Sequence, residues 1–145
     1  MKALIQRVKQ ASVTIDGELY SSINNGMLVL LGVMKDDTIE NAQKLAQKLI
    51  GLRIFEDEQG KMNKSIVDTN GEMLVVSQFT LCGDCKKGTR PSFDKSAPPE
   101  IAQKLYEDFV NIVKKEIPIV KTGEFRAMMD VALINDGPVT FMVEK

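Results

Sequence analysis

The feature that most limits the fold of this chain is an apolar run from Met27 to Met34, which contains Gly32 but no polar side chain. A short run of this kind is typical of a β-strand that is buried on both faces. It is far shorter than the ~20 residues that a membrane-spanning helix needs. The run therefore predicts an internal strand of a packed sheet and gives no indication of a membrane segment.

The rest of the first 34 residues also favours β-structure. Val13 and Ile15 alternate with polar neighbours, as in a half-buried strand. Asp16-Gly17 is a strong signal for a two-residue hairpin turn. A second turn signal, Asn24-Asn25-Gly26, stands directly before the apolar run. These signals predict strands joined by tight turns.

Two later segments change to helical spacing. Apolar residues recur at helical intervals from 38 to 52, with Asp37 or Thr38 as the N-cap. They do so again from about Pro98 to Glu116, where the two prolines are acceptable in the first turn. Further strands are expected at 53–55, 72–81, 117–121 and 131–143. Eighteen residues, 82–99, form a loop, and long loops in compact domains are usually functional.

Strands with two inserted helices predict an α+β fold with a largely antiparallel or mixed, barrel-like sheet. The length of 145 residues suits a single domain over 1–145. Neither helix begins with a glycine-rich phosphate loop, so we expect no nucleotide cofactor, and no other cofactor is indicated. Charged residues interrupt the first apolar stretch and no cleavage site follows, which predicts a cytoplasmic protein without a signal peptide.

The chain contains no histidine, and this excludes several kinds of catalytic site. Ser-His-Asp and Cys-His nucleophile pairs, histidine general bases and most zinc hydrolase sites all need that side chain. An enzyme of this composition must rely on backbone dipoles, hydroxyls, carboxylates, lysines or the substrate itself. Cys82 and Cys85 offer half a metal site or a redox pair. Because zinc needs about four ligands, we favour two reduced loop thiols and expect no metal.

Three segments carry residues suited to chemistry. Ser77-Gln78-Phe79-Thr80 turns a buried strand abruptly polar, which indicates either a cleft or paired backbone groups. Gly137-Pro138 interrupts a strand-like stretch, as a special backbone element or an ordinary turn would. Lys86, Lys87 and Arg90 lie in a segment, 82–95, with a local charge of +2 in a chain of net charge −1. They are candidates for phosphate contacts or simply solvated residues.

Taken together, in this order and spacing, the three segments resemble the D-aminoacyl-tRNA deacylases, which proofread amino-acid handedness on tRNA. The resemblance covers essentially the whole chain, from Arg7-Val8 and Ala11-Ser12-Val13 to Asn135-Asp136-Gly137-Pro138-Val139-Thr140. One departure is Arg126, where the family pattern leads us to expect glycine. This departure concerns the wall of the substrate pocket and its size preference.

The resemblance implies a homodimer with its active site at the subunit interface, acting on the aminoacylated 3′ end of tRNA. It implies that the segment from Ser77 through Gln78 and Phe79 to Thr80 forms one wall of the site and that the N–H groups of Phe79 and Thr80 stabilise the oxyanion. Gly137 and Pro138 would reach into the partner's pocket and reject L-amino acids, while D-amino acids and glycine fit. The tRNA 2′-hydroxyl would assist the attacking water.

Three alternatives remain open at this stage. Thr80 could instead act as a covalent nucleophile, although no histidine is present to activate it. The chain could be a non-catalytic RNA-binding module of the same fold. A redox or metal protein built on Cys82 and Cys85 is the weakest of the three.

Overall fold

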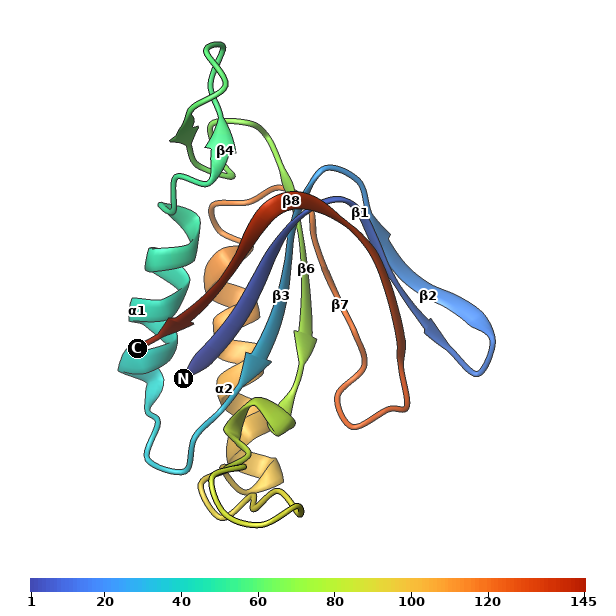
Figure 1. Cartoon of the computed structure of the whole chain (residues 1–145), viewed down its shortest axis with the longest axis vertical. Coiled ribbons are helices and arrows are strands. Elements are labelled where there is room, and N and C mark those ends of the chain that lie inside the picture. Colours follow the sequence, from blue (N-terminus) through green and yellow to red (C-terminus); the bar gives the residue numbers. More distant parts are fainter.

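The computed structural model describes all residues from 1 to 145 and has an α+β fold (Figure 1). A mixed sheet curls into a nearly closed, barrel-like shape, and two helices lie along one side of it. The elements in chain order are β1 (Lys2–Ile15), β2 (Glu18–Ile23), β3 (Gly26–Gly32), α1 (Ile39–Ile50), β4 (Phe55–Glu56), β5 (Met62–Lys64), β6 (Glu72–Ser77), the 3-10 helix η1 (Phe79–Cys82), α2 (Pro99–Val113), β7 (Val120–Thr122) and β8 (Asp130–Glu144). None of the helices is long and apolar enough to cross a membrane.

The long strand β1 organises the main sheet. Its first half pairs with β3 and its second half with β2, while β8 runs antiparallel along nearly its whole length. On the far side of β3, β6 and then β7 add in parallel, which gives the order β2-β1-β3-β6-β7. The sheet is therefore mixed, as the sequence predicts.

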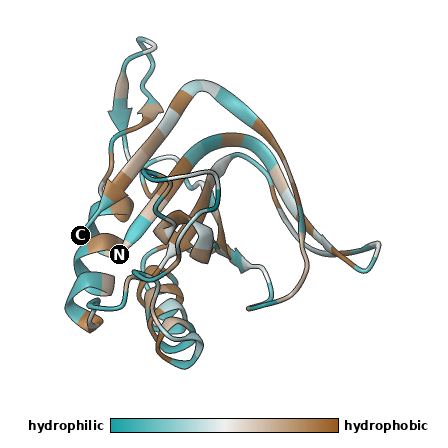
Figure 2. Cartoon of the chain, turned by 60° about the horizontal axis from the view of Figure 1, so that its bottom comes forward, coloured by the Kyte–Doolittle hydropathy of each residue, from teal (hydrophilic) through white to brown (hydrophobic).

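The apolar run of β3 is buried on both faces, which confirms the prediction. Met27, Val29 and Leu31 point into the large core that the sheet shares with α1 and α2. Leu28 points to the other face, into a smaller cluster within the curl of the sheet. Figure 2 shows hydrophobic and hydrophilic residues alternating along the long strands. The curled sheet thus has apolar contacts on each face.

The predicted strand over 72–81 is too long, because β6 ends at Ser77. Gln78 donates its backbone N–H to Leu31 at 2.8 Å, and Leu81 then donates back to Gln78 at 3.2 Å. These bonds turn the chain out of the sheet into η1, which sequence periodicity does not reveal; it also does not reveal the three-residue strand β5. A four-residue 3-10 helix is shorter than any periodic pattern.

Other predicted boundaries also need correction. The strand predicted at 53–55 is β4, displaced to Phe55–Glu56, and it pairs with β5 in a separate two-stranded sheet. The strand predicted at 117–121 is β7, which begins only at Val120 because turns continue the end of α2 as far as Ile117. The helices are shorter than predicted, at 39–50 and 99–113.

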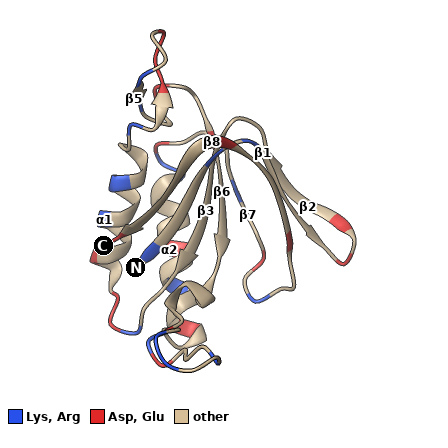
Figure 3. Ribbon diagram, in the orientation of Figure 1, with Lys and Arg blue, Asp and Glu red and all other residues tan.

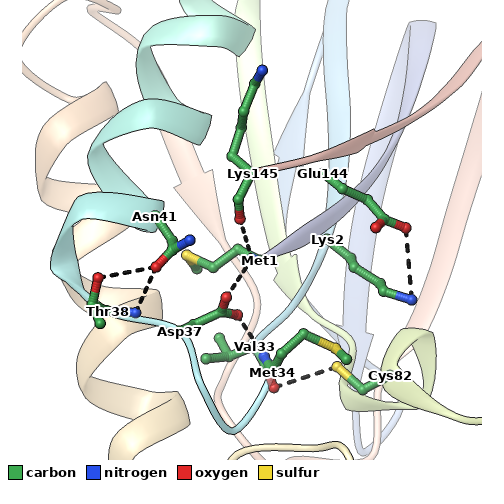
Figure 4. Close-up of polar contacts among 10 residues, drawn as sticks. All are labelled: Met1, Lys2, Val33, Met34, Asp37, Thr38, Asn41, Cys82, Glu144 and Lys145. Carbon is green, nitrogen blue, oxygen red and sulfur yellow. Dashed lines mark hydrogen bonds and ion pairs between the residues drawn. The ribbon is translucent and has the colours of Figure 1, made fainter.

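Several contacts hold the loop after β3 in place, and one of them joins it to η1 (Figure 4). The Asp37 carboxylate accepts hydrogen bonds from the Met1 amine and the Met34 backbone N–H, both at 2.6 Å. The Cys82 thiol donates to the Val33 carbonyl at 3.3 Å. A Cβ added at Gly32 would lie 3.1 Å from Cys82 Sγ, so glycine permits η1 to pack this closely on the end of β3.

Candidate active site

A cavity of about 760 Å³ opens beside η1, at one end of the main sheet. Three segments line it: the end of β6 with the start of η1, the stretch that leads into α2, and the loop between β7 and β8. Ten of its sixteen lining residues are hydrophobic, and Arg126 is the only one with a charged side chain. A mostly apolar cavity with a few polar groups is the usual form of a small-ligand site.

The polar segment at the end of β6 supplies one wall of this cavity. Ser77, Gln78 and Phe79 line it, and Thr80 follows directly on the exposed side of η1. Phe79 and Thr80 are the first two residues of η1. The first N–H groups of a helix have no partner within that helix. This wall therefore combines a hydroxyl, an amide and backbone donors at the cavity.

The Thr80 hydroxyl has one hydrogen-bond partner in the chain, the side-chain amide of Gln78, with Nε2 and Oγ1 2.5 Å apart. An amide cannot accept the proton that a hydroxyl must lose to become a nucleophile. Neither a carboxylate nor an amine bonds to this hydroxyl. The local geometry thus provides no base for covalent catalysis by Thr80.

Two aromatic rings form an exposed apolar surface on the cavity. Phe79 is 56% exposed and Phe93 is 39% exposed, and their ring centroids are 5.1 Å apart. Exposed phenylalanine rings are suited to stacking against a nucleobase. Sequence reasoning used only the backbone of Phe79 and did not single out Phe93 as a wall residue. The sequence signal for Phe93 is that it is an isolated phenylalanine in an otherwise polar loop.

Gly137 and Pro138 lie on a bulge in the middle of β8. Gln6 pairs with Thr140 and Val8 with Asn135, so four residues of β8 stand opposite the single residue Arg7. The Gly137–Pro138 peptide bond is cis, and both residues are exposed.

Arg7 holds the base of this bulge. Its side chain is only 4% exposed, and its Nε lies 2.9 Å from a carboxylate oxygen of Asp136. The N–H does not point at that oxygen, so the contact is an ion pair rather than an aligned hydrogen bond. Arg7 also donates to the Ile54 carbonyl at 2.7 Å and lies 3.4 Å from Glu56.

The bulge and the cavity lie apart along the sheet within one chain. In the strand register, Asn135 is level with Val8 and Gly26, whereas Ser77 is level with Leu31, five residues further along β3. At about 3.3 Å per residue this separates them by roughly 16 Å. Figure 1 shows the same separation between η1 and the middle of β8. The structure therefore does not bring Pro138 into the cavity of its own chain.

Nothing in the chain itself requires glycine at position 137. A Cβ there would meet only the side-chain amide of Asn135, at an ordinary 3.5 Å. This differs from Gly26, where a Cβ would collide with the Glu72 backbone at 1.8 Å. The chain itself therefore leaves room for a side chain at position 137.

The basic residues Lys86, Lys87 and Arg90 are exposed on the loop beside η1 (Figure 3). None of the three forms an ion pair within the chain, and none lines the cavity. Asp84 lies among them, and its pKa is lowered by the hydrogen bond from the Lys86 backbone N–H and by Lys95. Its negative charge offsets part of the local positive charge.

The two cysteines have different environments. Cys82 is buried and Cys85 is exposed, and they do not form a disulfide. Burial raises the pKa of the Cys82 thiol. Cys82 thus has a packing role between η1 and β3.

Arg126 has an unusual backbone conformation, with φ at +68°. The Ala127 N–H donates to the Glu124 carbonyl at 3.2 Å, so Arg126 is the third residue of a β-turn. A positive φ at this position alone is the pattern of a type II turn, which favours glycine. A residue with a Cβ costs about 1–2 kcal/mol here. The departure found in the sequence is thus a locally strained residue on the cavity wall.

The chain matches known proteins over nearly its whole length. The family model described as D-Tyr-tRNA(Tyr) deacylase matches residues 4–144. A D-aminoacyl-tRNA deacylase from Thermosipho africanus is 60% identical over 99% of this chain and 97% of its own length. One from Desulfatibacillum aliphaticivorans is 58% identical and covered to 99% in both chains.

Two solved structures share the fold. A protein titled c-Myc DNA Unwinding Element Binding Protein aligns with a TM-score of 0.95 and 43% identity, covering 100% of this chain and 99% of that one. A probable eukaryotic D-amino acid tRNA deacylase aligns with a TM-score of 0.87 over 99% and 98% of the two chains. At 17% identity the second likeness concerns the fold alone.

Proposed function

The chain belongs to the D-aminoacyl-tRNA deacylase family, hydrolases of the ester bond of aminoacyl-tRNA, and we propose that it removes D-amino acids and glycine from tRNA in the cytoplasm. The observation that carries this proposal is the cavity beside η1, with backbone N–H groups and exposed aromatic rings on one wall. An aminoacyl ester needs electrostatic help at its carbonyl oxygen more than a strong nucleophile, and this wall supplies such help.

In the proposed mechanism the terminal adenosine stacks at Phe79 and Phe93, with the aminoacyl group in the cavity. Water attacks the ester carbonyl carbon while the adenosine 2′-hydroxyl positions it. The N–H groups of Phe79 and Thr80 stabilise the negative oxygen that forms. The carbon–oxygen ester bond then breaks, and the tRNA oxygen leaves with a proton. One donor of this kind is typically worth about 2.7–4 kcal/mol.

Chiral rejection is proposed to come from Gly137 and Pro138 of the partner subunit in a homodimer. Two observations support this arrangement: the bulge is exposed about a sheet length from its own chain's cavity, and its glycine has open space around it. The carbonyl groups of such a bulge, placed beside the substrate Cα, would clash with an L side chain. Glycine and D-amino acids place only hydrogen there.

The first test is deacylation of matched D- and L-aminoacyl-tRNA by the pure protein. We expect D-alanyl- and glycyl-tRNA to be hydrolysed at least about 100-fold faster than L-alanyl-tRNA, a difference of about 2.7 kcal/mol in transition-state energy. Release of free amino acid is the measurement. Equal rates for the two enantiomers would refute the proposal.

A second prediction concerns tRNA contact by the basic loop. Replacing Lys86, Lys87 and Arg90 with glutamine should weaken tRNA binding and flatten its salt dependence, by roughly one unit of slope per lost phosphate contact. Binding measured across a series of salt concentrations tests this. Lys115, exposed in the turn that follows α2, gives a control substitution to glutamine. An unchanged slope would mean that the three residues are merely solvated.

The competing function is that of a nucleic-acid-binding module without catalysis. The relative titled a DNA unwinding element binding protein keeps this alternative in view. Turnover separates the two. A pure binding module would retain D-aminoacyl-tRNA at stoichiometric concentration without releasing free amino acid.

A further inference from the structure

We propose that Arg126 is a positioning residue that binds the phosphodiester next to the terminal nucleoside of the RNA substrate. The inference rests on the proposed function, because it assumes a nucleotide ester in the cavity. It starts from Arg126 as the only charged side chain among the lining residues of that cavity.

The guanidinium of Arg126 is free to bind a ligand. The residue is exposed, and it forms neither an ion pair nor a side-chain hydrogen bond within the chain. Arginine binds phosphate with two parallel N–H donors, which gives direction as well as charge. No other lining residue is charged, so Arg126 is the one cationic side chain of the cavity wall that can pair with an anion there.

The chemistry of the substrate determines which anion Arg126 can bind. The α-amino group of an aminoacyl ester is a cation at neutral pH and would be repelled by Arg126. The nearest obligatory anion is the phosphodiester on the 5′ side of the terminal nucleoside. With the base against Phe79 and Phe93 and the ester at the end of β6, this phosphate would border the cavity, whose wall includes Arg126 of the β7–β8 loop.

The backbone conformation of Arg126 indicates that its side chain has a function. With φ at +68° in a type II turn, glycine would fit better at this position. A strained non-glycine residue on a cavity wall indicates that its side chain is used. The substitution Arg126→Gly therefore leaves the turn intact, and its unfolding temperature should be no lower than that of the native protein.

The test compares two esters, only one of which carries the phosphodiester on the 5′ side of adenosine. These are D-alanyl-adenosine and the D-alanyl ester of the dinucleotide cytidylyl-adenosine, with D-alanyl-tRNA as the full substrate. For Arg126→Gln we expect KM to rise about tenfold on the dinucleotide and on tRNA, the equivalent of about 1.4 kcal/mol, with kcat nearly unchanged. On the nucleoside ester both constants should stay the same. Arg126→Lys keeps the positive charge but lacks the two parallel N–H donors, so its KM should lie between those of the native protein and Arg126→Gln.

Three results would overturn the proposal. The first is an unchanged KM on the dinucleotide, and the second is an equal loss on the nucleoside ester. The third is a change in the sedimentation of Arg126→Gln, which would assign Arg126 to a subunit contact. A native protein that hydrolyses none of the three esters would instead refute the proposed function. The matched control is Lys115→Gln, an exposed cation outside the cavity.

Discussion

Phe79→Pro should lose two to three orders of magnitude in kcat on D-aminoacyl-tRNA, because it removes an N–H proposed to stabilise the oxyanion. The loss of one such donor typically costs about 10²–10³ in kcat. Proline is acceptable at the first position of a helix, and Gln78 before it has φ −141° and ψ 79°, outside the helical region that proline disfavours. Steady-state kinetics and circular dichroism are the measurements.

Phe79→Ala is the matched control, since it removes the ring but keeps the N–H. We expect it mainly to raise KM through lost stacking, by about 1–3 kcal/mol in binding. A kcat for Phe79→Ala as low as that of Phe79→Pro would mean that the ring, and not the donor, is essential.

Thr80→Ala separates backbone catalysis from the hydroxyl nucleophile. It keeps the N–H and deletes the oxygen that Gln78 contacts. We expect most activity to survive, with a loss of about tenfold or 1.4 kcal/mol. A collapse by several orders of magnitude in a folded protein, with a trappable acyl-enzyme on the native chain, would instead establish Thr80 as the nucleophile.

The strands and helices that form the core follow from the sequence because each has either a periodic apolar pattern or a short apolar run. The run from Met27 to Leu31 is the clearest case, since its residues point alternately into the two clusters. The way the strands pair in the sheet does not follow from the sequence. No local pattern shows that β3 and β6 run in parallel, or that β8 lies along the whole of β1. Those contacts join residues far apart in the chain, and only the assembled sheet defines them.

The candidate site also has parts that the sequence predicts and parts that it does not. A polar segment at the end of a buried strand marks Ser77 to Thr80 in the sequence, but the turn into η1 depends on the bond from Gln78 to Leu31, in another strand. The walls formed by Phe93 and the β7–β8 loop have no periodic signal. The sequence alone also places no limit on the distance between Gly137 and Ser77. Their separation within one chain is a property of the sheet register.

A heterodimer of two defective chains should recover native behaviour at about half the native rate, because one of its two sites is complete. One chain carries Phe79→Pro and lacks a working cavity wall. The other carries Gly137→Ala, which its own fold tolerates, since the added Cβ meets only Asn135. Co-expression with two affinity tags and sequential purification isolates this heterodimer from both homodimers.

The expected result depends on which subunit supplies the bulge. If Gly137 serves the partner, the intact cavity of one chain receives the intact bulge of the other, and hydrolysis is again selective for D-esters. This holds whether the Gly137→Ala homodimer has lost activity or has gained hydrolysis of L-esters. If the bulge acted within its own chain, no site would be intact, and the heterodimer would be as defective as the two homodimers. A fully active monomer in sedimentation would exclude the cross-subunit site by a separate route. Because the bulge does not line its own chain's cavity, and Asn135 beside it lies roughly 16 Å from Ser77 along the strands, we expect recovery.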